Sequence, residues 1–408
     1  MNVEIRIWGG YTMVNEKMRM LGAKRSVIRE LFEYGKKRKA EIGAENVYDF
    51  SLGNPSVPAP DAVKEALEEL LARDAVSLHG YTSAQGDAGV RAVVADYINE
   101  TYNAGVTADC FYLTVGAAAS LTISLTALLH PGDEVVVLAP FFPEYTVFIE
   151  RTGAKIVPVL SDATTFQPDF DALSKAFTEK TRAIIVNSPN NPTGAVLTEE
   201  SVIRLAALLK EKEDLYGEPI YLISDEPYRE LVYGDVNVPY LTNYYDNTIV
   251  CYSFSKSLSL PGERIGYVLV SPKVTDFLSV YQAVCGAGRA LGFVCAPSIF
   301  QYMIPKVLGK TSDVSVYDTN RRMLYEALTE YGYFAVKPDG AFYLFVRALE
   351  EDANAFCERA KQYELLLVPG DDFGCPGFVR ISYCVSTEQI EKSLPAFKKL
   401  AESYGLAK

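Results

Sequence analysis

The chain has 408 residues, of which 49% are hydrophobic and 22% are charged, a composition that excludes intrinsic disorder. This length predicts two domains rather than a single core. The formal net charge of −13 excludes a general affinity for nucleic acid or for an anionic membrane, because either would need a broad basic face.

The N-terminal residues carry charges throughout and contain no apolar core of signal-peptide length. Met13 is a second candidate start, which would make residues 1–12 a weakly structured extension. No run of about 18 apolar residues occurs in the chain, so we expect no membrane span.

The cysteine and histidine content excludes two further classes of site. The seven cysteines lie far apart, without a CxxC pair, which predicts buried thiols in a reducing cytoplasm rather than disulfides. His79 and His130 are the only histidines, too few for a histidine-rich metal site. We expect both to be structural and expect no bound metal.

Seven short apolar segments predict an open, mostly parallel α/β sheet. They show little polar alternation, as expected for strands covered on both faces. Helical patterns at 117–129 and 201–217 lie between some of them. The predicted strands are FYLTV (111–115), EVVVLAP (134–140), KIVPVL (155–160), RAIIVNSP (182–189), IYLISDEP (220–227), TIVCYSFS (248–255) and GYVLVSP (266–272).

The pattern changes at about residue 290. A long helical segment to about 331 is followed by an apolar segment at 334–346, a helix near 352–363 and apolar segments ending at FVRISYC (378–384). This order predicts a smaller α+β unit. We therefore expect a large domain over 53–288 and a small domain over 289–408, to which residues 1–52 contribute.

Polar residues collect where the predicted strands end. Gly116 follows the first strand, Asn191 the fourth and Lys256 the sixth, while Asp225 ends the fifth. Ligands of open parallel sheets bind at the carboxyl ends of the strands. The sequence therefore predicts one site formed by these strand ends.

Lys256 and Asp225 each have an ordinary and a chemical interpretation. Most lysines are solvated surface residues, but Lys256 follows an apolar strand, and a desolvated amine is suited to a Schiff base with an aldehyde. Asp225 could be a helix cap or turn residue. Opposite a pyridine nitrogen, its carboxylate would keep that nitrogen protonated and make the ring an electron sink.

The neighbouring residues could hold the remaining groups of such a cofactor. Asn191 and Tyr228 could hydrogen-bond a ring hydroxyl, although NNPTG is also an ordinary turn sequence. Gly116 opens a helix whose N-terminal amides suit a phosphate. The other candidate phosphate ligands are Ser253, Ser255 and Arg264.

At this point SFSKSLSLPGERIGY (253–267) resembles the pyridoxal-phosphate lysine signature of the class I/II aminotransferases, the aspartate-aminotransferase-like enzymes of fold type I. The resemblance covers nearly the whole chain from about residue 25. The other motifs are SLGNPSVPAP (51–60), YTSAQGDAGVRAVVADYI (81–98), PFFPEY (140–145), NNPTG (190–194), SDEPY (224–228), GAFYLF (340–345) and FVRIS (378–382).

The resemblance implies pyridoxal 5′-phosphate as cofactor, amino-acid and 2-oxo-acid substrates, and a role for each matching residue. Lys256 is similar to the Schiff-base lysine that moves the Cα proton, Asp225 to the partner of the pyridine nitrogen, and Arg380 to the clamp on the substrate α-carboxylate. The remaining implied residues are Asn191 and Tyr228 at the ring oxygen, Phe142 stacked on the ring, Gly116, Ala117, Ala118, Ser253, Ser255 and Arg264 at the phosphate, and Gly53 and Asn54 near the carboxylate.

A homodimer with shared active sites is also implied, because Tyr81 is similar to a tyrosine that reaches the partner's phosphate. Two departures from the family pattern stand out. Ala117 and Ala118 offer no hydroxyl where many relatives carry Ser or Thr. Phe142 replaces the tryptophan of the aspartate-specific branch.

The sequence indicates the identity of the substrate side chain less directly than it indicates the cofactor. Arg289, 33 residues after Lys256, is at a spacing similar to that of an arginine that binds the distal carboxylate across the dimer, or it is an ordinary surface arginine. We expect aspartate or glutamate as donor and 2-oxoglutarate as acceptor. The alternatives are an aromatic or neutral amino acid, or β-elimination by a C–S lyase; a non-catalytic regulator would need an additional DNA-binding domain.

Overall fold

The computed structural model describes residues 7–8, 11–12, 14–23 and 27–406. Met13, the second candidate start, lies outside these residues. Within the predicted extension, the described residues form two short strands, β1 (Ile7–Trp8) and β2 (Tyr11–Thr12), that pair antiparallel. The helix α1 (Glu16–Ala23) follows.

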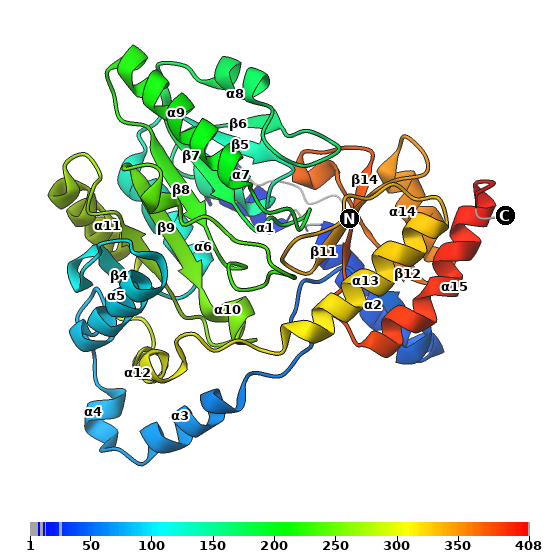
Figure 1. The fold of residues 1–408 in the computed structure, drawn as a ribbon, viewed down its shortest axis with the longest axis horizontal. Coiled ribbons are helices and arrows are strands. Elements are labelled where there is room, and N and C mark those ends of the chain that lie inside the picture. Colours follow the sequence, from blue (N-terminus) through cyan, green and yellow to red (C-terminus); the bar gives the residue numbers. More distant parts are fainter. Residues whose placement is uncertain (1–6, 9–10, 13, 24–26, 407–408) are drawn as a thin grey trace.

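A seven-stranded sheet forms the centre of the larger part of the molecule (Figure 1). Its order is β4-β10-β9-β8-β7-β5-β6, and only β10 runs antiparallel to its neighbours. The predicted mostly parallel sheet is confirmed, strand by strand. The strands are β4 (Phe111–Thr114), β5 (Glu134–Ala139), β6 (Lys155–Leu160), β7 (Thr181–Asn187), β8 (Tyr221–Asp225), β9 (Thr248–Ser253) and β10 (Gly266–Val270).

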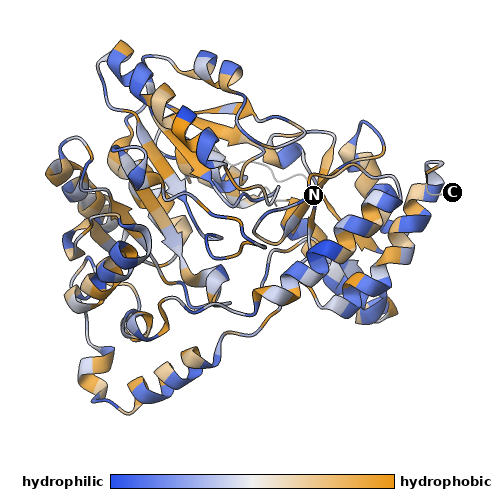
Figure 2. Ribbon diagram, in the orientation of Figure 1, coloured by the Kyte–Doolittle hydropathy of each residue, from blue (hydrophilic) through white to orange (hydrophobic). Residues whose placement is uncertain are grey.

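Helices cover both faces of this sheet, which explains why its strands are apolar on both sides (Figure 2). On one face lie α6 (Ala117–Leu128), α7 (Glu144–Glu150) and α11 (Phe277–Leu291). On the other lie α5 (Ala88–Tyr102), α8 (Phe170–Ala176), α9 (Glu199–Tyr216) and α12 (Ser298–Val307). The helices α3 (Asp61–Leu71) and α4 (Ala75–His79) extend along the edge of the molecule.

The smaller α+β part contains a three-stranded sheet of order β11-β14-β13. Its strands are β11 (Tyr343–Arg347), β13 (Val368–Pro369) and β14 (Phe378–Ser382), and its helices are α2 (Val27–Ile42), α13 (Val314–Glu330), α14 (Ala353–Lys361) and α15 (Thr387–Ser403). The strand β3 (Tyr48–Asp49) pairs parallel with β12 (Leu365–Leu366). A segment of the N-terminal region thus joins the C-terminal one.

The predicted continuous helical segment from 290 to 331 is wrong. α11 ends at Leu291 and is capped by Gly292, whose φ of 76° is left-handed, and α12 and α13 are separate helices. Met303 of α12 belongs to the same hydrophobic core as Phe111 of the large sheet, whereas Tyr317 of α13 belongs to the core of the small part. We propose that the small domain begins between α12 and α13 rather than at residue 289, which lies inside α11.

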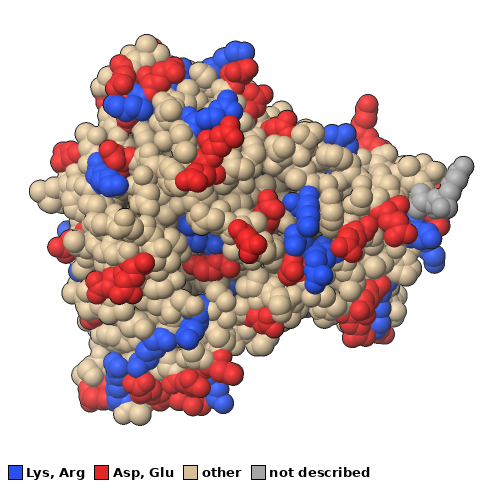
Figure 3. Space-filling view, viewed as in Figure 1, with Lys and Arg blue, Asp and Glu red and all other residues tan. Residues whose placement is uncertain are grey.

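The surface carries both charge signs. On the face drawn in Figure 3, acidic and basic side chains are interspersed among uncharged ones. Of the helices in the described ranges, none is long and apolar enough to cross a membrane. All seven cysteines lie in those ranges as free thiols, five of them buried. No metal-binding cluster of His, Cys, Asp and Glu occurs among the described residues.

Candidate active site

Lys256 lies in a short helix, α10 (Phe254–Ser257), that directly follows β9. Its Nζ donates a hydrogen bond to the carbonyl of Gly53, at 2.7 Å. Burial, together with the nearby charges of Arg264 and Arg380, lowers the pKa of the Lys256 amine to about 8. The amine is therefore partly neutral near neutral pH, the state in which it can act as a nucleophile or base.

Asp225 ends β8 and is buried. The hydroxyl of Tyr145 donates to its Oδ2 at 2.5 Å, while its Oδ1 has no partner among the described residues. Burial raises the pKa of Asp225 to about 7. A buried carboxylate oxygen without a partner fits a protonated ring nitrogen, which would supply both the hydrogen bond and the opposite charge.

Tyr145 is not among the predicted site residues, although it ends the PFFPEY motif. Its ring lies edge-on to Phe142, with ring centroids 5.7 Å apart. The same motif thus supplies both the half-buried ring at 142 and the hydroxyl that orients Asp225.

Asn191 and Tyr228 follow strands of the large sheet, and each contacts a residue of the small sheet: Asn191 contacts Arg380 and Tyr228 contacts Tyr343. The backbone N–H of Asn191 donates to Asn187 Oδ1 at 2.7 Å, and Asn187 Nδ2 donates to the Asp225 carbonyl at 2.8 Å. The hydroxyl of Tyr228 lies 2.8 Å from that of Tyr343 on β11. Asn187 and Tyr343 are further residues that were not predicted; both lie in or beside motifs that were.

The three candidate phosphate ligands that have polar side chains, Ser253, Ser255 and Arg264, lie together beside Gly116. Ser253 Oγ is 2.7 Å from Ser255 Oγ, and Arg264 Nη1 donates to Ser255 Oγ at 3.4 Å. Gly116 has a φ of 95°, and a Cβ added there would lie 2.8 Å from Arg264 Nη2. The guanidinium therefore lies over the N-terminus of α6, a position that only glycine permits.

The first amides of α6 lie at the same place. Ala119 and Ser120 both donate to the Gly116 carbonyl, each at 3.1 Å, and Ala117 and Ala118 precede them in the first turn. The amides of Ala117 and Ala118 lie at helix positions whose N–H groups have no acceptor within the helix. Together with the guanidinium and two hydroxyls they form a set of donors that fits a phosphate group.

Arg380 is a buried arginine on β14. Its Nη2 donates to the Ser51 carbonyl at 2.6 Å and its Nη1 to Asn191 Oδ1 at 3.2 Å, while Nε is buried without a partner in the described structure. The guanidinium lies between the rings of Tyr343 and Phe373, 4.9 and 5.0 Å from their centroids. A guanidinium that is held through Nη1 and Nη2 and still has unused N–H groups fits a carboxylate.

The two predicted neighbours of Arg380 differ in position. Gly53 lies against the hydroxyl of Tyr343 and bonds Lys256. Asn54 is exposed, and its side chain bonds the carbonyl of the adjacent Pro55. Ser51, which starts the same motif, supplies the carbonyl that holds Arg380.

Within one chain, two predicted site residues lie away from this cluster. Tyr81 is 99% exposed, and Arg289 is exposed in the last turn of α11. Their segments adjoin each other, since the Cys295 N–H donates to the Ala84 carbonyl at 3.2 Å. Both residues are therefore presented on the surface rather than in the buried site.

This group of buried side chains at the strand ends of a mostly parallel sheet fits a small ligand that carries a carboxylate. The family model for aminotransferase class I and II matches residues 44–397, so the chain belongs to that family. The predicted resemblance is confirmed, as is the fold of the aspartate aminotransferases. The chain is an aminotransferase, and its family depends on pyridoxal phosphate.

Named relatives support the same assignment. The chain is 32% identical over 383 residues to the aspartate aminotransferase of Thermotoga maritima, covering 92% of this chain and 97% of that one. It is 29% identical over 394 residues to aromatic-amino-acid aminotransferase 2 of Thermococcus litoralis, covering 92% and 95%. The crystal structure of an aminotransferase from Eubacterium rectale matches with a TM-score of 0.95 at 57% identity, covering 97% of this chain and 100% of that one.

Proposed function

We propose that this aminotransferase binds pyridoxal 5′-phosphate and moves the amino group of aspartate or glutamate to 2-oxoglutarate in a ping-pong cycle. The observation that carries the proposal is the set of incompletely paired buried groups at one edge of the sheet. Asp225 Oδ1 and Arg380 Nε have no partners among the described residues, and the Lys256 amine is buried with a lowered pKa.

When bound, pyridoxal phosphate supplies an electron sink for the charge left on the substrate Cα. Asp225 would hold its ring nitrogen, and Asn191 and Tyr228 its ring oxygen. Phe142 would stack on the ring. Its phosphate would be held by Ser253, Ser255, Arg264 and the amides that follow Gly116, at Ala117 and Ala118.

Two residues act on the amino acid itself. Arg380 binds the α-carboxylate through its fork, which fixes the orientation of Cα. Lys256 would take the proton from the substrate Cα and release it on the other side of the amino nitrogen, to C4′ of the cofactor. A pKa of about 8 suits this base role, because a base near the working pH both accepts and releases a proton readily.

The dicarboxylate preference and the dimer are connected proposals. We infer that Tyr81 and Arg289 act in the partner subunit's site, Tyr81 at the phosphate and Arg289 at the distal carboxylate. Their exposure on adjoining segments supports this inference. The relative named aspartate aminotransferase supports only the dicarboxylate substrate. The free cysteines support a cytoplasmic location.

A second candidate donor is an aromatic amino acid. The rings of Tyr343 and Phe373 on the two sides of Arg380 favour it, because a substrate bound there meets aromatic surface. The Thermococcus litoralis relative carries an aromatic name.

A donor panel against 2-oxoglutarate separates the two candidates. We expect the highest kcat/KM for aspartate or glutamate among aspartate, glutamate, tyrosine, phenylalanine and alanine. Arg289→Ala should reduce the preference for aspartate over alanine by on the order of 2–4 kcal/mol, the loss of a desolvated ion pair. Arg204→Ala, an exposed arginine on α9, is the matched control and should leave the ratio unchanged. An unchanged ratio in Arg289→Ala would exclude Arg289, and a preference for tyrosine would favour the second candidate.

A further inference from the structure

Tyr343 is a buried tyrosine whose hydroxyl lies where three parts of the candidate site meet. The hydroxyl is 2.8 Å from that of Tyr228, and the ring centroid is 4.9 Å from the Arg380 guanidinium carbon. A Cβ added at Gly53 would collide with the Tyr343 hydroxyl, and the carbonyl of Gly53 accepts from Lys256. One side chain thus contacts the elements expected to hold the cofactor, the carboxylate and the amine.

The sheet register places Tyr343 beside Arg380. Tyr343 is opposite Ser382 and Phe345 is opposite Arg380 in the antiparallel pair β11·β14, so Tyr343 and Arg380 are diagonal neighbours on one face.

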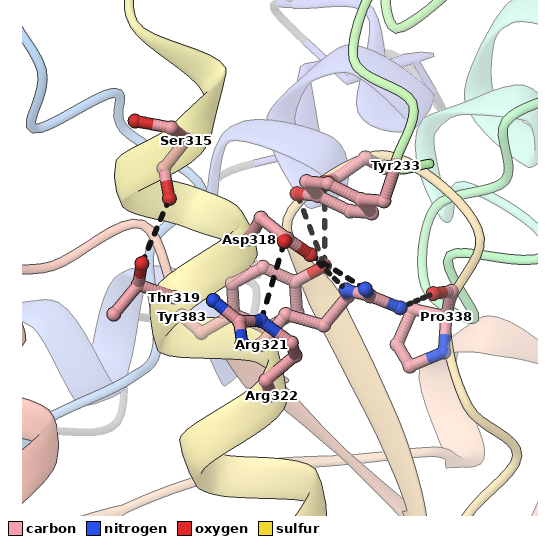
Figure 4. A network of polar contacts seen from close by, with 9 residues as sticks. Tyr233, Ser315, Asp318, Thr319, Arg321, Arg322, Pro338 and Tyr383 are labelled. Atoms are coloured by element: carbon pink, nitrogen blue, oxygen red, sulfur yellow. Dashed lines mark hydrogen bonds and ion pairs between the residues drawn. The ribbon is translucent and has the colours of Figure 1, made fainter. Parts of the chain in front are cut away.

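The segment that enters β11 is fixed by a network shown in Figure 4. Arg321 donates to the Pro338 carbonyl at 2.8 Å, and the Tyr383 hydroxyl donates to that of Tyr233 at 3.3 Å. Tyr233 in turn donates to the Ala341 carbonyl.

The two hydroxyls constrain each other because each carries one proton. Tyr228 can donate that proton to Tyr343 or to another acceptor, but not to both. Burial raises the pKa of Tyr228 well above its ordinary value, so the hydroxyl keeps its proton at neutral pH. When Tyr228 donates elsewhere, its free lone pair can accept the proton of Tyr343, and a hydroxyl that accepts a hydrogen bond becomes a stronger donor.

We propose that Tyr343 is a positioning residue that donates its hydroxyl proton to Tyr228 and thereby aims the Tyr228 O–H at the ring oxygen of bound pyridoxal phosphate. This inference rests on the proposed function. Asn191 is already oriented in another way, since its Oδ1 accepts from Arg380. Tyr343 would thus orient the side chain of Tyr228 by a hydrogen bond, as Arg380 orients that of Asn191.

The test is the pH midpoint of the absorbance change of bound pyridoxal phosphate, measured by titration without substrate. Donation to the ring oxygen stabilises its deprotonated form, so a lost donor raises the midpoint. Tyr228→Phe should raise it by about one to two pH units, the value of one strong hydrogen bond. Tyr343→Phe should raise it by a few tenths of a unit, because only the cooperative part is lost.

The double variant decides whether Tyr343 acts through Tyr228. We expect Tyr228→Phe/Tyr343→Phe to have the midpoint of Tyr228→Phe alone, because the Tyr343 hydroxyl then has no acceptor to strengthen. Tyr333→Phe is the matched control, since it removes a buried hydroxyl of the same part that donates to the Phe397 carbonyl on α15 rather than to the segment that enters β11. Its midpoint should equal that of the wild type.

Two results would overturn the inference. One is a Tyr343→Phe midpoint equal to the wild type in a protein that binds the cofactor. The other is a shift that adds to that of Tyr228→Phe. Failure of the proposed function looks different, because the wild type itself would then show no cofactor absorbance and the inference would fall with it.

Discussion

At the scale of single residues, the candidate site is made of groups whose burial costs folding free energy. Burial lowers the pKa of Lys256 to about 8 and raises that of Asp225 to about 7, so burial disfavours the charged form of both. Arg380 is buried, and its Nε has no partner in the part of the chain that the structure describes. These costs are consistent with residues retained for binding and chemistry, and they predict opposite dependences of stability on pH.

Lys256→Met should stabilise the cofactor-free protein near neutral pH. The amine has a pKa of about 8 when folded and about 10.5 when unfolded. Its cost is therefore fully present below about pH 8 and absent above about pH 10.5, on the order of 3 kcal/mol at most. Urea unfolding should show an advantage for Lys256→Met at about pH 7 that shrinks as the pH approaches 10. A difference independent of pH would contradict the buried, shifted amine.

Asp225→Asn should show the reverse dependence. A carboxyl whose pKa rises from 3.8 to about 7 on folding destabilises the protein above about pH 7 and has no such cost below about pH 4. Unfolding of the cofactor-free proteins at about pH 5 and pH 8 should therefore show a larger advantage for Asp225→Asn at the higher pH. An advantage that is larger at pH 5 would exclude the raised pKa.

At the scale of elements, the sheet was predictable and the break between α11, α12 and α13 was not. Strands buried on both faces are runs of apolar residues, and each run ends within three residues of its predicted end. The segment after residue 290 has helical spacing on both sides of Gly292 and Gly309. Between the helices, Gly292, Cys295 and Gly309 have left-handed φ angles, and Pro297 caps α12. Spacing does not reveal such a turn, because an isolated glycine is tolerated in a helix.

Gly116→Ala should weaken cofactor binding through the element that it begins. The new Cβ would displace Arg264 from the N-terminus of α6, and we expect affinity for pyridoxal phosphate to fall roughly 10- to 100-fold. Gly132→Ala is the control, since Gly132 has the same φ of 95° and nothing within 4 Å of the added carbon. Both variants should lose about 1–3 kcal/mol of stability from backbone strain, but only Gly116→Ala should bind the cofactor more weakly. Equal affinities would contradict the phosphate site.

At the scale of the whole molecule, the site forms where the two cores meet. Three residues that follow strands of the large sheet, Lys256, Asn191 and Tyr228, each have a hydrogen-bond partner outside the large part. Lys256 bonds Gly53 of the N-terminal segment, while Asn191 bonds Arg380 and Tyr228 bonds Tyr343 of the small part. The motifs predicted the reactive residues, because their chemistry is visible in residue type. Partners such as Ser51, Tyr145 and Tyr343 were not predicted, because hydroxyl and carbonyl contacts between distant segments leave no local pattern.

A shared active site predicts recovery of activity on mixing two inactive dimers. Lys256→Ala removes the base, and Tyr81→Ala removes the exposed residue proposed to act in the partner subunit's site. A heterodimer has one site with both defects and one with neither, so random mixing should restore about a quarter of wild-type activity. Mixing Lys256→Ala with Asp225→Asn should restore none, because each site then carries a defect. Equal results from both mixtures would exclude a contribution of Tyr81 across the interface.

The most direct test of the central claim is the identity of the residue that carries the cofactor. Borohydride reduction of the protein loaded with pyridoxal phosphate, followed by peptide mass spectrometry, should place the label on Lys256 alone. Prior addition of aspartate without an oxo acid should remove that label by converting the cofactor to its amino form. A label on another lysine, or a protein that retains no cofactor, would contradict the assignment of this strand end as the catalytic centre.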